Sequence, residues 1–171
     1  CAELPAGDGR SIGGAYETVT RALGFGPHGQ GQTMALAAFA DGDPASLRDA
    51  YEVNSFEDWT LDEAVLQRLA HARVKEGDGF DSDAGRRLAA DVQAATEHAM
   101  IALARSASAS PGDGWAIAGG VALNCRANSA LRDALGAPLW VPSSAHDSGT
   151  ALGAALEAAH VLGEPPCSPL R

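Results

Sequence analysis

The chain has 171 residues, of which 46% are hydrophobic, and this length and composition suit one domain with its own core. The formal net charge of −10 argues against nucleic-acid binding, because phosphates repel an acidic surface and the basic residues are scattered along the chain. The sequence contains no run of about 20 apolar residues, which argues against a membrane span.

The first ten residues, CAELPAGDGR, lack the basic and apolar regions of a signal peptide, and the chain has no initiator Met. We therefore expect a processed chain or a piece of a longer one. Three cysteines, Cys1, Cys125 and Cys167, are too few and too widely spaced for a disulfide framework or a CxxC metal site. These features predict a cytoplasmic protein with free thiols.

The first half of the chain predicts helices separated by loops. Residues 10–25 predict a helix that is capped by Ser11 and ended by glycines. Residues 26–43 form a Gly-rich loop, the apolar run MALAAFA and an acidic turn, and the run suits either a buried strand or a short helix. Residues 44–82 predict variable surface structure, with a helix over 61–74.

The second half alternates helices with short apolar strands. A long helix is predicted over 83–107, with a narrow stripe of residues that allows close packing: Leu88, Val92, Ala95, Ala99 and Leu103. After a break at 108–114, the strands WAIAGG and APLWVP alternate with a helix closed by Gly136 and a helix over 148–162. This order predicts an α/β layer structure over 1–171.

The first candidate site is the Gly-rich turn GGVALN, residues 119–124, which follows an apolar strand and opens a helix. Gly119 and Gly120 would let a phosphate or ribose approach the backbone, because neither carries a Cβ. Asn124 can cap the helix or bind a ligand hydroxyl. A tight turn with a capping residue explains the same pattern without any ligand, and the turn is neither GxGxxG nor a P-loop.

The second candidate site is the stretch SSAHDSGTALGAAL, residues 143–156, where a strand has ended and a helix begins. Asp147 can be the N-cap of that helix, or it can bind a divalent metal such as Mg²⁺, Mn²⁺ or Fe²⁺ beside a phosphate. His146 can add a nitrogen ligand or simply be exposed. Both alternatives remain open on the sequence alone.

The other histidines and acidic runs show no metal-ligand spacing. We expect His28, His71, His98 and His160 to be solvated or to lie at the edge of the core. Asp62 and Glu63 are expected to be solvated residues at a helix start. The sequence contains no G-x-S-x-G elbow and offers no Cys–His pair, so the catalytic residues cannot be named.

The two turns taken together, GGVALNCRAN and HDSGTALGAAL with a helix and a strand between them, resemble the O-carbamoyltransferases of nodulation and antibiotic tailoring. The segment IGGAYETVTRALGFGPHGQGQTMALAAFADGD is also similar to that family, with a helix, a Gly-rich turn and an M-G-L-A-x-Y-G-like strand. The resemblance covers nearly the whole chain and places it in the C-terminal portion of the family's catalytic domain. That domain has the actin/sugar-kinase-like ATPase architecture, and the resemblance therefore implies a mixed sheet flanked by helices. It is also similar to the domain of tRNA threonylcarbamoyl-transfer enzymes.

This resemblance implies a specific chemistry. Family members move a carbamoyl group from carbamoyl phosphate to an alcohol of a natural product or sugar, through a carbamoyl-adenylate made with ATP. It implies that Gly119, Gly120 and Asn124 line the nucleotide site, and that Asp147, with His146 as a further candidate, binds the divalent metal. A cation beside a phosphoanhydride would neutralise negative charge where it develops.

Three departures from the family pattern argue against a complete active site. The HxxxH-type metal ligands belong to an N-terminal half that this chain lacks, and the adenylate-forming domain that should follow is also missing. We expect both on the same chain or on a second one. The family's E-G-K-x-M-G-L-A run reads Gln30-Gly31-Gln32-Thr33-Met34-Ala35-Leu36-Ala37, so two charged positions are neutral amides.

Three hypotheses follow. The first is part of an O-carbamoyltransferase that forms half of a nucleotide cleft. The second is a non-catalytic, degenerate half-domain that acts as a binding or scaffold partner, which Gln30 and Gln32 favour slightly. The third is another enzyme of the same architecture, such as a sugar kinase, which the pairing of GGVALNC with HDSGTALGAAL argues against.

Overall fold

A computed structural model describes residues 11–41, 50–55, 57–62, 64–65, 82–107 and 114–164. The elements in chain order are helices α1 (Ile12–Ala22) and α2 (Gln30–Leu36), the 3-10 helix η1 (Ala37–Phe39), strands β1 (Tyr51–Val53) and β2 (Trp59–Leu61), helix α4 (Asp83–Ser106), strand β3 (Trp115–Ala116), the 3-10 helix η3 (Gly120–Leu123), helix α5 (Cys125–Leu135), strand β4 (Leu139–Trp140) and helix α6 (Gly149–Val161).

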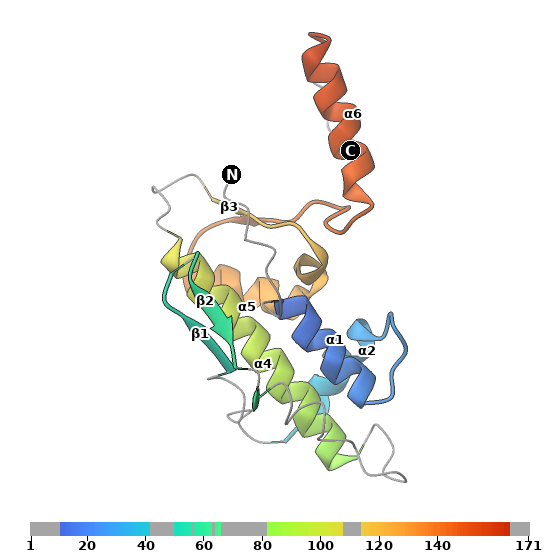
Figure 1. Cartoon of the computed structure of the whole chain (residues 1–171), viewed down its shortest axis with the longest axis vertical. Helices are drawn as coiled ribbons and strands as arrows, with labels where there is room; N and C mark the ends of the chain where they lie inside the picture. Colours follow the sequence, from blue (N-terminus) through green and yellow to red (C-terminus); the bar gives the residue numbers. More distant parts are fainter. Residues whose placement is uncertain are drawn as a thin grey trace.

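Helix α4 is the centre of the core and contacts α1, α2, η1, β1 and α5 (Figure 1). The predicted stripe on this helix is confirmed, since its members are all buried and Ala99 is fully inaccessible to solvent. Small side chains on this face let the neighbouring helices approach closely. The N-terminus of α4 is capped by Ser82, whose hydroxyl accepts a hydrogen bond from the Gly85 N–H at 3.1 Å.

Helices α1 and α2 pack against α4 and against each other. The predicted cap of α1 is confirmed, because the Ser11 hydroxyl accepts a hydrogen bond from the Gly14 N–H at 3.0 Å. Two fully buried hydroxyls, those of Thr20 and Thr33, form a hydrogen bond of 2.9 Å between α1 and α2. This bond satisfies two polar groups that would otherwise be costly to bury.

The apolar run MALAAFA is helical and contributes to α2 and η1. The strand that the family resemblance implied for this segment is therefore wrong. Thr33, Leu36 and Ala37 are buried at helical spacing, and the Ala-rich composition has a high helix propensity.

The described part of 44–82 contributes to the core, so the prediction of variable surface structure is wrong there. Strands β1 and β2 form an antiparallel hairpin in which Tyr51 pairs with Leu61 and Val53 with Trp59. The rings of Tyr51 and Trp59 lie 6.2 Å apart and are both buried. Leu61 ends a strand rather than beginning a helix, because aromatic and β-branched neighbours favour the hairpin. Most of the helix predicted over 61–74 lies outside the described residues.

The fold is mixed α/β, as predicted, but the described strands form two separate pairs instead of one mixed sheet. Besides the β1–β2 hairpin, β3 and β4 pair in parallel, with Trp115 opposite Leu139 and Ala116 opposite Trp140. Helix α5 connects the two parallel strands and ends at Gly136, whose φ of 61° is left-handed, as the sequence predicted. The actin/sugar-kinase-like assignment remains a prediction.

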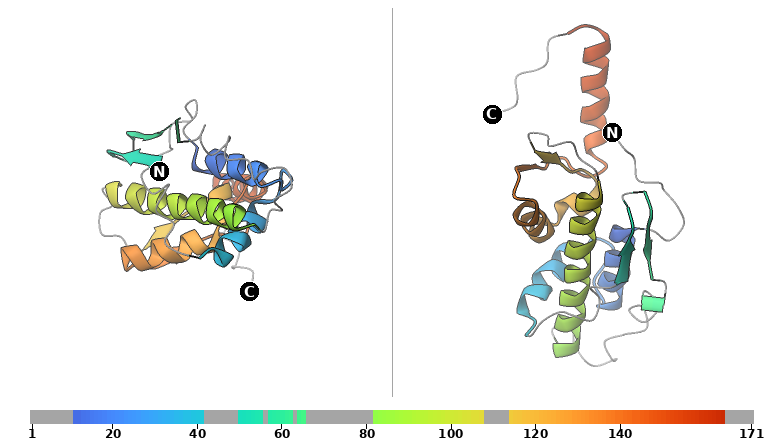
Figure 2. Two further views of the ribbon diagram at one scale, coloured as in Figure 1. Left: turned by 90° about the horizontal axis from the view of Figure 1, so that it is seen from below. Right: turned by 90° about the vertical axis from the view of Figure 1, so that its left-hand side faces the viewer.

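Helix α6 extends away from the rest of the molecule (Figures 1 and 2). It contains no buried residue, and Leu152, Leu156 and Val161 are about half or more exposed. Leu123 in η3 and Trp140 in β4 are also large apolar side chains that are exposed. Over the part of the chain that the structure describes, no helix combines the length and apolar character that crossing a bilayer would require.

Candidate functional site

The two Gly-rich turns singled out from the sequence are in direct contact. The Gly119 N–H donates a hydrogen bond to the Ala145 carbonyl at 2.6 Å. This bond lies just beyond the parallel pairing of β3 and β4, in which the Ile117 N–H donates to the Trp140 carbonyl at 3.1 Å. Both turns therefore lie at the carboxyl ends of two parallel strands, which is where α/β proteins bind ligands.

The GGVALN turn requires glycine at position 119, and there is open space beside both Gly119 and Gly120. Gly119 has a φ of 99°, a conformation that residues with a Cβ rarely adopt. A Cβ built on either Gly119 or Gly120 would have no protein atom within 4 Å. The packing of the described residues therefore does not explain the glycine at position 120, whose backbone φ is ordinary.

Asn124 caps α5, which confirms one of the two roles predicted for it. Its Oδ1 accepts a hydrogen bond from the Ala127 N–H at 3.0 Å. Its Nδ2 donates to the side-chain carbonyl of Gln93 at 2.9 Å, and Gln93 Nε2 donates back to Oδ1 at 3.1 Å. One Nδ2 proton of Asn124 has no acceptor among the described residues, so the side chain keeps one donor for a ligand.

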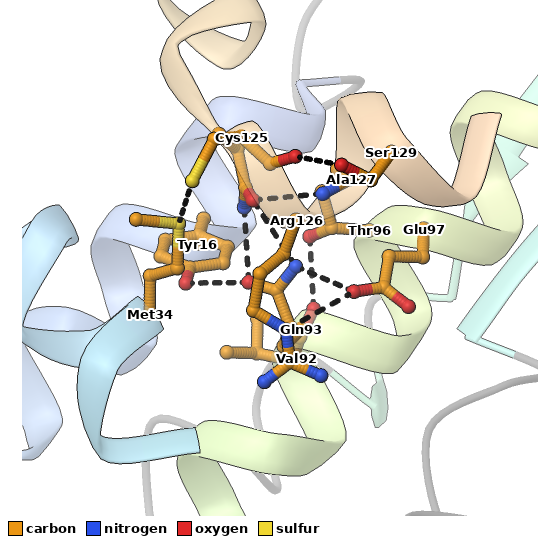
Figure 3. A network of polar contacts seen from close by, with 11 residues as sticks. Tyr16, Met34, Val92, Gln93, Thr96, Glu97, Cys125, Arg126, Ala127 and Ser129 are labelled. Atoms are coloured by element: carbon orange, nitrogen blue, oxygen red, sulfur yellow. Dashed lines mark hydrogen bonds and ion pairs between the residues drawn. The ribbon is translucent and has the colours of Figure 1, made fainter. Parts of the chain in front are cut away.

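Gln93 is the residue of this site that the sequence reasoning missed. It is only 1% exposed, and its amide joins α1, α4 and the start of α5 in one polar network (Figure 3). The detectable signal was an amide, followed three residues later by Thr96, among alanines and aliphatic residues on the buried side of a helix. A polar side chain in such a place requires a partner, since its burial is otherwise costly.

The HDSG turn is exposed, and Asp147 is not the N-cap of α6. That position belongs to Ser148, which makes no capping bond with its side chain. The Asp147 carbonyl instead accepts from the Thr150 hydroxyl at 2.6 Å, while its carboxylate has no partner among the described residues. His146 Nε2 lies 3.2 Å from the Ser148 hydroxyl, so that ring is engaged locally. The capping interpretation of Asp147 is therefore wrong, and its carboxylate is available to a ligand.

Glycine is also required at position 149 of this turn. A Cβ there would overlap the Ser144 carbonyl oxygen, because the backbone of the turn folds back tightly on itself. This close approach fixes the path of the chain between β4 and α6. It places Asp147 only two residues from the hydrogen bond between Ala145 and Gly119.

The described residues do not form a metal site by themselves. They contain no cluster of three or more His, Cys, Asp or Glu side chains that could hold an ion. His28, His98 and His160 belong to no such cluster, and His71 lies outside the described residues. Asp62 marks a helix start as predicted, since its carboxylate accepts from the Ala64 N–H at 2.8 Å, whereas Glu63 lies outside the described residues.

The segments that carry the family resemblance meet near the GGVALN turn. A Cβ on Gly13, in the first turn of α1, would lie 3.4 Å from Val121 in η3. Met34 of α2 reaches the exposed Cys125 at the start of α5, with their sulfur atoms 3.8 Å apart. Gln30 donates to the Pro27 carbonyl at 3.1 Å and so stabilises its own turn.

Comparison with known proteins gives two findings. The family profile described as Carbamoyltransferase N-terminus matches residues 3–156. The nodulation protein NolNO of Sinorhizobium fredii (strain NBRC 101917 / NGR234) is 32% identical over 171 aligned positions, which cover 95% of this chain and 25% of that protein. The chain thus spans about a quarter of the length of this relative.

Proposed function

Because the chain belongs to the carbamoyltransferase family, we propose that it forms the nucleotide-binding wall of an O-carbamoyltransferase. The reaction would transfer a carbamoyl group from carbamoyl phosphate, through a carbamoyl-adenylate made with ATP, to a hydroxyl of a natural product or sugar. The observation that carries this proposal is the hydrogen bond between Gly119 and Ala145, which joins two Gly-rich turns at the carboxyl ends of parallel strands.

The residues present fit a nucleotide. The open side of Gly119 and Gly120 offers a place where a ribose or phosphate can contact the backbone. Asn124 would donate its remaining Nδ2 proton to a hydroxyl or phosphate oxygen of the nucleotide. Their task is to bind and orient the adenylate, so that the acceptor alcohol meets the carbamoyl carbon in a productive geometry.

The divalent metal is a different case, because the described residues do not complete a site for it. Asp147 supplies one unpaired carboxylate and His146 one ring. Asp147 is the proposed metal ligand, with His146 as a further candidate. Completion of the site would require ligands that lie outside the described residues.

The first test is the binding of ADP to the purified chain, measured by isothermal titration calorimetry with and without Mn²⁺. We expect weak binding, with a dissociation constant of about 1 mM or somewhat lower, that Mn²⁺ strengthens. Asp147→Ala should abolish the effect of Mn²⁺ and leave the binding without metal unchanged. The absence of any ADP binding at millimolar concentration would contradict the proposal.

A second variant tests the location of the nucleotide. Gly120→Ala adds a methyl group into space that the protein leaves empty, so we expect an unchanged fold and at least about a tenfold weaker affinity for ADP. Gly26→Ala is the matched control, because a Cβ there also has no neighbour within 4 Å and Gly26 lies in the loop between α1 and α2. Equal ADP binding by both variants would place the nucleotide elsewhere.

One observation favours a second candidate function, a non-catalytic scaffold that pairs with a partner chain. Helix α6 exposes Leu152, Leu156 and Val161, and a soluble protein usually covers apolar surface of this kind. A scaffold would bind a protein partner through this surface and would show no metal-dependent affinity for ADP. The calorimetric experiment therefore distinguishes the two functions.

A further inference from the structure

We propose that Gln93 is a positioning residue that holds Asn124 in one orientation and so keeps its spare N–H in place for the nucleotide. This inference rests on the proposed function, since it concerns the same site. Gln93 is buried at 1% exposure in the middle of α4, so it can touch no ligand itself. It would act only through Asn124, which lies 31 residues further along the chain.

The amide of Gln93 uses its full hydrogen-bonding capacity. Its Oε1 accepts from the Tyr16 hydroxyl at 2.9 Å and from Asn124 Nδ2 at 2.9 Å. Its Nε2 donates to the Glu97 carboxylate at 2.8 Å and to Asn124 Oδ1 at 3.1 Å. An amide with all four bonds made can be buried without a large penalty, and breaking one bond leaves a buried polar atom unsatisfied.

The partners of Gln93 also decide which way its amide points. The ionised carboxylate of Glu97 only accepts, so it must face Nε2. The Tyr16 hydroxyl must then donate to Oε1, and burial raises the pKa of this phenol well above its ordinary value, which keeps the proton in place. Reversal of the amide would oppose two acceptors at Glu97, and the orientation is therefore fixed.

A fixed Gln93 amide fixes Asn124 in turn. The two side chains form a reciprocal pair, in which each amide donates to the carbonyl oxygen of the other. Asn124 cannot rotate without breaking both of these bonds and the capping bond from the Ala127 N–H. Its single remaining N–H consequently points in one direction, and a group held in advance loses less conformational entropy when a ligand binds.

The network also extends along α5. Arg126 Nε lies 3.8 Å from the Glu97 carboxylate, so the group that orients Gln93 is itself held by the helix that Asn124 caps. Tyr16 connects the same amide to α1, whose first turn contacts η3 through Gly13 and Val121. The orientation of Asn124 thus depends on three helices that pack together, α1, α4 and α5 (Figure 3).

The test is a double-mutant cycle in the full chain, with Gln93→Met, Asn124→Ser and the double variant, and with ADP plus Mn²⁺ as the probe. Met removes the amide at a similar volume, and Ser retains a capping oxygen while removing the N–H. We expect each single variant to weaken ADP affinity about fivefold, the effect of one hydrogen bond. The double variant should be no weaker than the weaker single variant, because both changes remove the same contact.

The control for a purely structural role is Thr96→Val. Thr96 is a second buried polar residue of α4, and its hydroxyl donates to the Val92 carbonyl of its own helix at 2.8 Å. This variant should lower stability without changing the affinity for ADP. The inference would be overturned if the losses of ADP affinity in the two single variants multiply in the double variant. It would also be overturned if Gln93→Met loses no affinity.

A measurement without ligand separates this inference from the proposed function. In the ¹⁵N–¹H spectrum, we expect one side-chain N–H of Asn124 to be protected from exchange, and Gln93→Met to remove that protection. Protection that is unchanged in Gln93→Met would overturn the inference whatever ADP does. Lost protection in a protein that binds no ADP would reject the proposed nucleotide site, and with it the ligand-directed role, while confirming the amide geometry.

Discussion

The two longest helices of the described structure, α4 and α6, differ in burial, and the difference is the opposite of what their compositions suggest. Helix α4 has 24 residues with several charged side chains, and it buries one whole face. Helix α6 has 13 residues with only one acidic side chain, and it buries none. The more apolar helix is the exposed one, so burial is decided by the neighbours a helix has as well as by its composition.

This difference assigns separate tasks to the two regions. Helix α4 contacts α1, α2, η1, β1 and α5 and provides the rigid support on which Asn124 is held. The chain that leads into α6 carries the exposed Asp147 and no comparable support. The proposed site lies where the supported turn, GGVALN, meets the unsupported one, HDSG.

The largest effect is expected from truncation of the α4 core. Leu103 is 5% exposed, and Leu103→Ala should lower the free energy of unfolding by about 3 kcal/mol, through lost burial and the cavity that remains. Urea denaturation followed by circular dichroism at 222 nm measures this change. A loss below about 1 kcal/mol would mean that α4 is not the centre of the core.

The next effect concerns the turn between the two regions. Gly149→Ala would place a methyl group on the Ser144 carbonyl, so the HDSG turn must change its path. We expect ADP affinity to fall at least about tenfold, with the free energy of unfolding changed by less than about 1 kcal/mol, since the turn contributes little to the core. Gly153→Ala is the control, because a Cβ at that position meets nothing within 4 Å.

A smaller effect should differ in sign between two equally buried tyrosines. The Tyr16 hydroxyl donates to Gln93, whereas the Tyr51 hydroxyl is buried without a partner in the described structure. Tyr16→Phe should lower the free energy of unfolding by about 1 kcal/mol, and Tyr51→Phe should leave it unchanged or raise it by up to about 1 kcal/mol. Equal losses in the free energy of unfolding, measured by urea denaturation, would show that the hydrogen bond from Tyr16 to Gln93 does not distinguish the two tyrosines.

The smallest effect is expected on α6 itself. Leu156 is 49% exposed, so Leu156→Ala should change the free energy of unfolding by less than about 0.5 kcal/mol. This variant is the direct counterpart of Leu103→Ala, with the same chemical change on a helix without a buried face. A loss comparable with that of Leu103→Ala would show that α6 is covered in solution.

The sequence was sufficient for features that depend on local patterns. Helical spacing located α1, α4 and α5, and the capping residues Ser11 and Asn124 follow from short-range hydrogen bonding. The two Gly-rich turns singled out from the sequence are joined by a hydrogen bond in the structure, and the ligand site between them stays a prediction. The family assignment was also correct, because the residues that carry it form a continuous pattern along the chain.

Features that depend on distant contacts could not be predicted. The β1–β2 hairpin is short, and its place in the core depends on Tyr51 and Trp59 packing near α4. The run MALAAFA allows both strand and helix until its partners α1 and α4 are known. Gln93 acquires its role only through Asn124, a residue that no local pattern connects to it.

The isolation of α6 has a consequence for amide hydrogen exchange. Helices shorter than about 12–15 residues are only marginally stable in water when nothing packs against them, and α6 has 13 residues and no buried side chain. Its amides should therefore exchange almost as fast as those of a free peptide, while those of α4 exchange only on global unfolding. Slowly exchanging amides in α6 would then report directly that another surface has covered this helix.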